Sequence, residues 1–259
     1  MTNSQRVDLA ESGPVDVTYT EYGTGRPLLL LHGGAGPASV TAFAERLAAD
    51  GFRVLVPVHP GFEGTPRPEP LTTIAGLARL YSALLDALDL TGVTVAGNSI
   101  GGWITAELAL LGSPRVAGVV LVDAVGLDLP QAAIADFFSL TMDEVAELSY
   151  ANPDAFRIDP AKLPPERQAA MAGNRAALQV YGGTTMADPT LLGRLPAAAT
   201  PALVVWGAAD RIVPPEHGKA YSDALPDAKF VLIEDAGHLP QLETPAKLQE
   251  LVAEFAEEA

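Results

Sequence analysis

The sequence contains no cysteine, and this absence excludes several kinds of site. A disulfide scaffold, an iron–sulfur cluster, a zinc site with thiolate ligands and a cysteine nucleophile all require this residue. Proteins of reducing compartments rarely carry disulfides, so the absence also fits an intracellular location. We therefore expect a cytoplasmic protein whose chemistry uses oxygen and nitrogen groups rather than sulfur.

Basic residues and long apolar runs are also scarce. Lys and Arg number 16 against 32 Asp and Glu, which gives a formal net charge of −16 at pH 7. A surface this acidic does not attract nucleic-acid phosphates or anionic lipid. The longest apolar run, within 116–125, is interrupted by Asp123, whereas a membrane-spanning helix needs about 20 apolar residues. The N-terminal residues do not resemble a secretory signal. We expect a small-molecule substrate, no nucleic-acid or membrane partner, and leave a homodimer open.

Short apolar runs typical of buried strands alternate with amphipathic helical patterns over most of the 259 residues. Strands are predicted at 15–19, 28–31, 52–58, 93–96, 116–122, 201–206 and 229–233. This alternation predicts an α/β fold with a mostly parallel, doubly wound sheet and helices on both faces. The alternation lapses in 127–196, where only short helical patterns occur. We therefore predict a core formed by 1–126 and 197–259, with a helical cap, 127–196, inserted between its two parts.

A serine stands at the centre of residues 97–101, Gly-Asn-Ser-Ile-Gly, which match the motif G-x-S-x-G. The motif follows the predicted strand 93–96 and opens the predicted helix 100–111. A sharp turn there would hold Ser99 above the carboxyl edge of the sheet, where the positive end of the helix dipole also points. The structural alternative is a glycine-rich turn with a capping serine, but the strand-turn-helix context favours a nucleophile.

A serine hydroxyl needs a base within hydrogen-bond reach before it can act as a nucleophile at neutral pH. His238 follows the predicted strand 229–233 and therefore lies at the same edge of the sheet as Ser99. His217 falls within a predicted helix, so we expect it at the surface. His32 and His59 each follow a strand and are also placed to face the site. We predict that His238 is the base.

The base in turn needs a carboxylate that holds its tautomer and stabilises the imidazolium. Asp210 follows the strand 201–206, and the chain order Ser99, Asp210, His238 is that of a Ser-Asp-His hydrolase triad. Asp123, at the end of the strand 116–122, is the alternative acid. A third interpretation is that Asp210 is an ordinary turn or capping residue.

The oxyanion of a tetrahedral intermediate needs two converging N–H donors. One is expected from the backbone of Ile100, which follows the nucleophile. The other should come from the glycine-rich loop 32–37, with Gly34 as the first choice and Ala35 as the alternative. This loop lacks the glycine spacing of known phosphate-binding loops, which argues against a nucleotide site.

Together, the segments HGG, GNSIGG, WGAADRIVP and GHLPQLETP resemble the serine-nucleophile branch of the α/β-hydrolase superfamily. HGGAGPAS and GNSIGG are further similar to meta-cleavage-product C–C hydrolases. That group places an arginine in its cap to bind a substrate carboxylate, and Arg175 could correspond to it. Two positions depart from the pattern: Leu239 stands where that group typically has tryptophan, and His59 where many relatives have aspartate.

The resemblance implies a serine hydrolase that cleaves a small carboxylic ester through an acyl-enzyme, without a metal or organic cofactor. One alternative is a C–C bond hydrolase acting on a 2-hydroxy-6-oxo-dienoate type substrate. Another is a member of the fold that binds a ligand without catalysis, and a perhydrolase or acyltransferase would use the same triad. We expect Arg175, Phe137 and Leu239 to contact substrate. The other interpretations are that Phe137 packs inside the cap and Arg175 is solvated.

Overall fold

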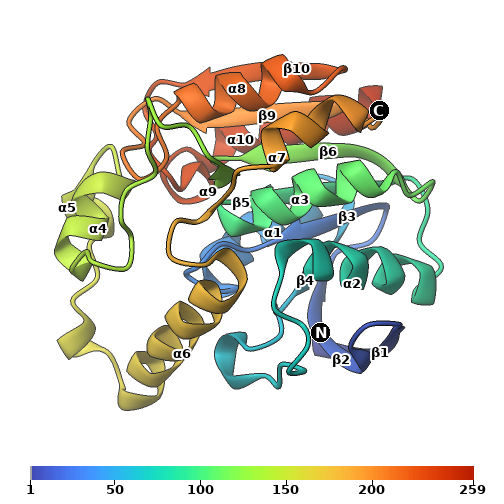
Figure 1. The fold of residues 1–259 in the computed structure, drawn as a ribbon, viewed down its shortest axis with the longest axis horizontal. Coiled ribbons are helices and arrows are strands. Elements are labelled where there is room, and N and C mark those ends of the chain that lie inside the picture. The colour runs from blue at the N-terminus through green and yellow to red at the C-terminus, as the bar shows by residue number, and fades with distance from the viewer. Residues whose placement is uncertain (1) are drawn as a thin grey trace.

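The structure, a computed structural model that describes residues 2–259, is built around an eight-stranded sheet (Figure 1). The spatial order is β1-β2-β4-β3-β5-β6-β9-β10. The strands from β4 to β10 pair in parallel, whereas β2 runs antiparallel to both of its neighbours. The predicted mostly parallel sheet is therefore confirmed. The strands are β1 (Thr2–Leu9), β2 (Gly13–Tyr22), β3 (Arg26–Leu31), β4 (Phe52–Pro57), β5 (Val93–Asn98), β6 (Val116–Val122), β9 (Ala202–Gly207) and β10 (Ala228–Ile233).

Helices cover both faces of this sheet, as the alternating pattern predicted. Strand β3 illustrates the division, because successive side chains of a strand point to opposite faces. Leu29 and Leu31 pack in the core beneath α2, α3 and α8, while Leu28 and Leu30 pack in the core beneath α1 and α10. The helices of the two layers are α1 (Ala38–Ala49), α2 (Ile74–Ala87), α3 (Ile100–Leu111), α8 (Glu216–Ala224) and α10 (Pro245–Glu258), with the short α9 (Pro240–Glu243) before the last.

Strand β1 was not predicted. It pairs with β2 at the edge of the sheet, and Val7 is its one buried side chain. An edge strand with both faces largely in water carries no apolar alternation, so the sequence offers little signal for it.

Residues 127–196, the predicted cap, are mostly helical. Figure 1 shows α4, α5 and α6 beyond the end of the sheet toward which the parallel strands point. Two very short strands, β7 (Gly126–Leu127) and β8 (Ala187–Asp188), pair in parallel, although the sequence predicted no strand in this segment. The helices are α4 (Met142–Ser149), α5 (Pro153–Phe156), α6 (Pro165–Gly182) and α7 (Leu191–Arg194), with 3₁₀ turns η2 (Pro160–Lys162) and η3 (Leu195–Ala197); a further turn, η1 (Phe62–Gly64), follows β4. Within residues 2–259, no helix is long and apolar enough to cross a membrane.

Candidate active site

Ser99 occupies the turn between β5 and α3 with a strained backbone, φ 58° and ψ −117°. A positive φ at a residue with a side chain costs roughly 1–3 kcal/mol and persists only where the surroundings impose it. The surroundings here are tight, because a Cβ at Gly97 would lie 2.2 Å from the oxygen of Gly101. One at Gly101 would lie 2.3 Å from the oxygen of Leu31. The glycines of the motif therefore let strand and helix approach closely enough to form this turn.

His238 and Asp210 are joined by a hydrogen bond of 2.7 Å between Nδ1 and Oδ2. The Asp210 side chain is fully buried, and its Oδ1 accepts the N–H groups of Ile212 at 2.8 Å and Val213 at 2.9 Å. Because a carboxylate only accepts hydrogen bonds, the neutral imidazole carries its proton on Nδ1 and keeps a lone pair on Nε2. This is the tautomer that a general base acting on Ser99 requires.

Asp123, the alternative acid, lies beside this pair. Among the hydrogen bonds of residues 2–259, none joins Asp123 to His238. Its Oδ1 accepts the N–H of Gly207 at 2.8 Å. The partner of His238 is therefore the aspartate that the chain order favoured.

The loop that carries His238 is bonded to the end of helix α4. The N–H of His238 donates to the oxygen of Ser149 at 2.6 Å, and the N–H of Arg211 donates to the oxygen of Leu148 at 3.0 Å. A Cβ at Gly237 would lie 2.2 Å from the Ser149 oxygen, so only glycine allows this approach. His238 and the loop after Asp210 are thus anchored on the last turn of helix α4.

Asn98, for which the sequence predicted no role, bonds to the loop that carries His238. Its Nδ2 donates to the oxygen of His238 at 2.9 Å, and its Oδ1 accepts from Nε2 of Gln241 at 3.1 Å. Asn98 is buried at the end of β5. The signal for its role was a polar amide next to the predicted nucleophile, at the end of an otherwise apolar strand.

The predicted oxyanion loop lies against the turn at Ser99. Gly33, Gly34 and Ala35 line the same cavity as Ser99 and His238. A Cβ at Gly34 would lie 2.8 Å from Cδ2 of Leu178 on α6, so glycine allows this helix to pack directly on the loop. Ile100, whose N–H is the other predicted donor, directly follows Ser99 as the first residue of α3.

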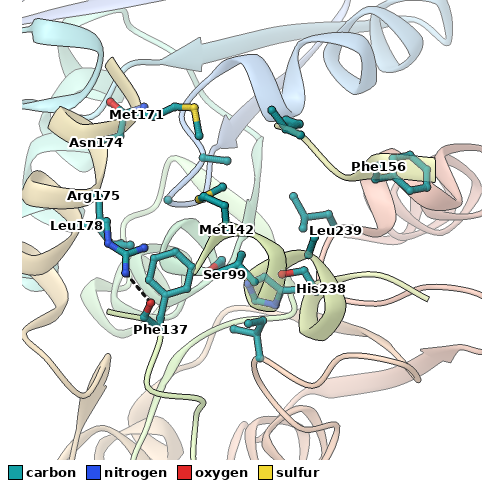
Figure 2. Close-up of a pocket in the computed structure, with 18 of the residues that line it drawn as sticks. Ser99, Phe137, Met142, Phe156, Met171, Asn174, Arg175, Leu178, His238 and Leu239 are labelled. Carbon is teal, nitrogen blue, oxygen red and sulfur yellow. Dashed lines mark hydrogen bonds between the residues drawn. The ribbon is translucent and has the colours of Figure 1, made fainter. Parts of the chain in front are cut away.

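A cavity of about 520 Å³ separates the sheet edge from α4 and α6. Ser99 and His238 lie together in its wall, as Figure 2 shows. The remainder of the wall is mainly apolar, and the predicted contact residues Phe137 and Leu239 belong to it. Further apolar side chains include Met142, Val145, Met171, Leu178 and Ile212.

Arg175 also lines the cavity, but its guanidinium is engaged within the cap. Nη2 donates to the oxygen of Phe137 at 2.8 Å (Figure 2) and lies 3.5 Å from the oxygen of Leu140. The guanidinium also sits 4.8 Å from the ring centre of Phe137 and 5.5 Å from that of Phe138. These contacts bind α6 to the loop that precedes α4.

Residues 28–251 match the model of the Alpha/beta hydrolase family. The chain belongs to this family.

This alpha/beta hydrolase is 28% identical over 254 residues to the 2-hydroxy-6-oxo-6-(2'-aminophenyl)hexa-2,4-dienoic acid hydrolase of Metapseudomonas resinovorans, covering 90% of this chain and 85% of that protein. It is also 28% identical over 270 residues to the 2-hydroxymuconate semialdehyde hydrolase of Pseudomonas putida, covering 92% of this chain and 90% of that protein. Among solved structures, a thermophilic esterase from Thermogutta terrifontis is 28% identical with a TM-score of 0.78, covering 99% of this chain and 98% of the other. The predicted resemblance is confirmed.

Two further histidines of this alpha/beta hydrolase pack behind the glycine-rich loop 32–37 and are not among the residues that line the cavity. His32 and His59 are fully buried, with ring centres 3.8 Å apart. Nδ1–H of His32 donates to the oxygen of Gly33 at 2.8 Å, and its Nε2 accepts the N–H of His59 at 3.2 Å. Nε2–H of His59 donates to the oxygen of His32 at 2.9 Å, and Tyr81 donates to its Nδ1. Every ring nitrogen is used in its neutral form, so both rings must stay uncharged.

Acidification is expected to destabilise the protein through these histidines. Burial lowers the pKa of His59 from 6.5 to about 4 and that of His32 in the same direction. As the pH falls below 6.5 the unfolded chain takes up these protons first, so stability present above pH 6.5 is lost progressively toward pH 4. The contribution of His59 alone is about 3 kcal/mol. Urea denaturation between pH 7 and pH 4 measures this loss.

His59→Gln is the matched variant, because glutamine offers a donor and an acceptor but does not titrate. Its free energy of unfolding should depend less steeply on pH over the same range. Equal pH slopes in the variant and the natural protein would contradict this account.

The expectation that His217 lies at the surface is wrong. It is fully buried on α8, and its Nε2 donates to the oxygen of Ala132 at 2.6 Å. Helix α8 packs against the sheet through Gly218, while residues of the segment after β7 cover its other side. The covering residues belong to the segment 127–196. No periodic pattern in the sequence predicted that this segment packs on α8.

Proposed function

We propose that this alpha/beta hydrolase cleaves small carboxylic esters through an acyl-enzyme formed on Ser99. The observation that carries the proposal is the 2.7 Å bond between His238 and Asp210, in the wall of the cavity that Ser99 lines. The thermophilic esterase that shares the fold and 28% of its residues over nearly the whole chain supports the same chemistry.

In the proposed reaction, the Ser99 oxygen attacks the ester carbonyl while Nε2 of His238 accepts the hydroxyl proton. Asp210 stabilises the resulting imidazolium through Nδ1–H. The N–H groups of Gly34 and Ile100 bind the oxyanion, and the imidazolium then gives its proton to the departing alkoxide. Water attacks the acyl-enzyme with His238 again as the base, and the acid is released. No step calls for a metal or an organic cofactor.

The cavity wall favours an apolar acyl or alcohol group. The side chains around Ser99, among them Phe137, Met142 and Leu239, offer hydrocarbon surface (Figure 2). Leu239 directly follows the base, so it contributes apolar surface close to the reacting carbonyl. A neutral ester gains from burial here, whereas a free charge loses its hydration.

The second candidate is hydrolysis of a C–C bond in a 2-hydroxy-6-oxo-dienoate. The names of the relatives from Metapseudomonas resinovorans and Pseudomonas putida favour it, and Arg175 lines the cavity where a substrate carboxylate would need a cation. We prefer the ester because Nη2 and the faces of the Arg175 guanidinium are already used by Phe137, Phe138 and Leu140.

The deciding experiment measures kcat/KM for p-nitrophenyl esters of rising acyl length beside a 2-hydroxy-6-oxo-dienoate. We expect turnover of the esters, with a preference for acyl chains that fill the apolar cavity, and little turnover of the dienoate. A kcat/KM for the dienoate well above that for every ester would replace the proposal with its alternative. Labelling of Ser99 by a fluorophosphonate separates both enzymes from a non-catalytic binding protein, because only an activated serine reacts.

Replacing Arg175 by alanine separates the two enzymatic candidates. Because its guanidinium anchors the loop at Phe137 in the structure, we expect kcat/KM to fall by a common factor, no more than about tenfold, for both substrate classes. If Arg175 binds a substrate carboxylate instead, the dienoate alone should lose at least ~30-fold, as expected when one partner of a buried charge pair is truncated. Arg167→Ala is the comparison, because Arg167 also lines the cavity but bonds to Glu63.

A further inference from the structure

Two carboxyl groups lie side by side behind the base. Oxygen atoms of Asp123 and Asp210 and a ring nitrogen of His238 are all within 4.8 Å of one another. Asp123 comes from the end of β6, and its backbone adopts a positive φ of 45°. A non-glycine residue in this conformation is strained, so the local structure holds the side chain in this place at a cost.

The two oxygens of Asp123 have different surroundings. Oδ1 accepts the N–H of Gly207 at 2.8 Å. Oδ2 is completely buried, and no donor from residues 2–259 reaches it. An ionised carboxylate would leave that oxygen unsatisfied away from water, which is costly. A proton on Oδ2 would turn the same atom into a donor.

The acceptor for such a proton is Asp210. Its Oδ1 already accepts two N–H groups, and its Oδ2 accepts Nδ1–H of His238. Each carboxylate oxygen has room for a second donor. Facing Asp123 are therefore Asp210, the His238 ring and the N–H of Gly207, with Glu243 as a more distant negative charge. Burial and the negative charge of Asp210 raise the pKa of Asp123 well above its usual range.

We propose that Asp123 is a neutral carboxylic acid that donates its Oδ2 proton to Asp210 and thereby positions the Asp210–His238 pair. The inference rests on the proposed use of His238 as the base. The proton removes the repulsion between two buried carboxylates and ties Asp210 to β6 as well as to its own loop. The proton also removes a second negative charge from beside His238, because such a charge would stabilise the imidazolium and leave less of the neutral base at low pH.

Asp123→Asn tests the protonation state, because the amide keeps an acceptor for Gly207 and a donor for Asp210 without a charge. The measurement is kcat/KM against pH for a p-nitrophenyl ester. We expect the pKa of the acidic limb to stay within about 0.3 unit of the natural protein and kcat to stay within about threefold. If Asp123 is ionised, the variant removes a negative charge and that pKa falls by about one unit or more, which overturns the proposal. Asp128→Asn, an exposed change of equal charge five residues away, is the control.

Asp123→Ala tests the positioning role by removing the donor. We expect kcat to fall at least ~10-fold with KM changed little, because a bond to a charged group behind the base is lost. A variant with natural kcat and a natural pH profile would overturn the role.

Infrared spectroscopy of the free protein gives a readout independent of any substrate and of the folding of the alanine variant. The difference spectrum of the natural protein minus Asp123→Asn at neutral pH should contain the carbonyl stretch of a protonated carboxylic acid. A carboxylate band in its place would overturn the inference. Failure of the ester assays alone, with this acid band present, would count against the proposed substrate and not against the neutral Asp123.

Discussion

Replacing Ser99 by alanine is expected to lower kcat for ester hydrolysis by at least ~10³-fold, because triad members act as a unit and the covalent step has no substitute nucleophile. The change removes one oxygen from a position whose backbone is already held at a positive φ by its neighbours. The free energy of unfolding should therefore change little. Steady-state kinetics of the purified variant, with urea denaturation to confirm its stability, measure both effects.

Ser222→Ala, a change of the same chemistry on α8, is the control and should keep normal turnover. His238→Ala should match Ser99→Ala in its loss of kcat. Near-normal turnover by the alanine variant of Ser99 would remove the acyl-enzyme from consideration and leave a mechanism in which water attacks directly.

Asp210→Asn is expected to reduce kcat by a comparable factor, at least ~10³-fold, for a reason that lies in the hydrogen bonds of the acid. Oδ1 of Asp210 accepts from Ile212 and Val213. The amide oxygen of asparagine must keep that place, since an NH₂ group there would face two donors. The NH₂ group then faces Nδ1 of His238 and forces the proton to Nε2, where it blocks proton transfer from Ser99.

The same asparagine change at the neighbouring acid sharpens this test. Asp123→Asn should leave kcat within about threefold, so the two isosteric variants differ by orders of magnitude although their carboxyl groups lie side by side. If Asp123→Asn is the more damaging change, Asp123 is the triad acid and the assignment of Asp210 is wrong.

The sheet, the turn at Ser99 and the glycine-rich loop 32–37 were predictable because each is indicated by residues adjacent in the sequence. A buried parallel strand such as 28–31 is an unbroken apolar run, and Ser99 lies in a motif that directly follows another such strand, 93–96. β1 gave no such signal, since Val7 is its one buried side chain. His217 was misplaced because its cover, the residues near Ala132, comes from a segment 85 residues away.

The roles of polar groups depended more on distant contacts. Asn98 could be seen in the motif, but its bond to His238 spans 140 residues and only the folded chain reveals it. The same holds for Arg175: the sequence allowed a substrate contact or a solvated side chain, and only the folded chain reveals its bond to the oxygen of Phe137. Periodicity places a residue on a face, but it does not say which backbone oxygen that residue will meet.

The anchoring of His238 on helix α4 has a consequence for how substrate preference can diverge. The bonds from His238 and Arg211 end on main-chain oxygens of Ser149 and Leu148, which every side chain at these positions provides. Substitutions along α4, including the cavity-lining Met142 and Val145, can therefore reshape the pocket without releasing His238. The sequence constraint moves to Gly237, where any side chain would collide with the helix end. Libraries that vary α4 while keeping this glycine should yield altered acyl-chain selectivity with a high fraction of active members.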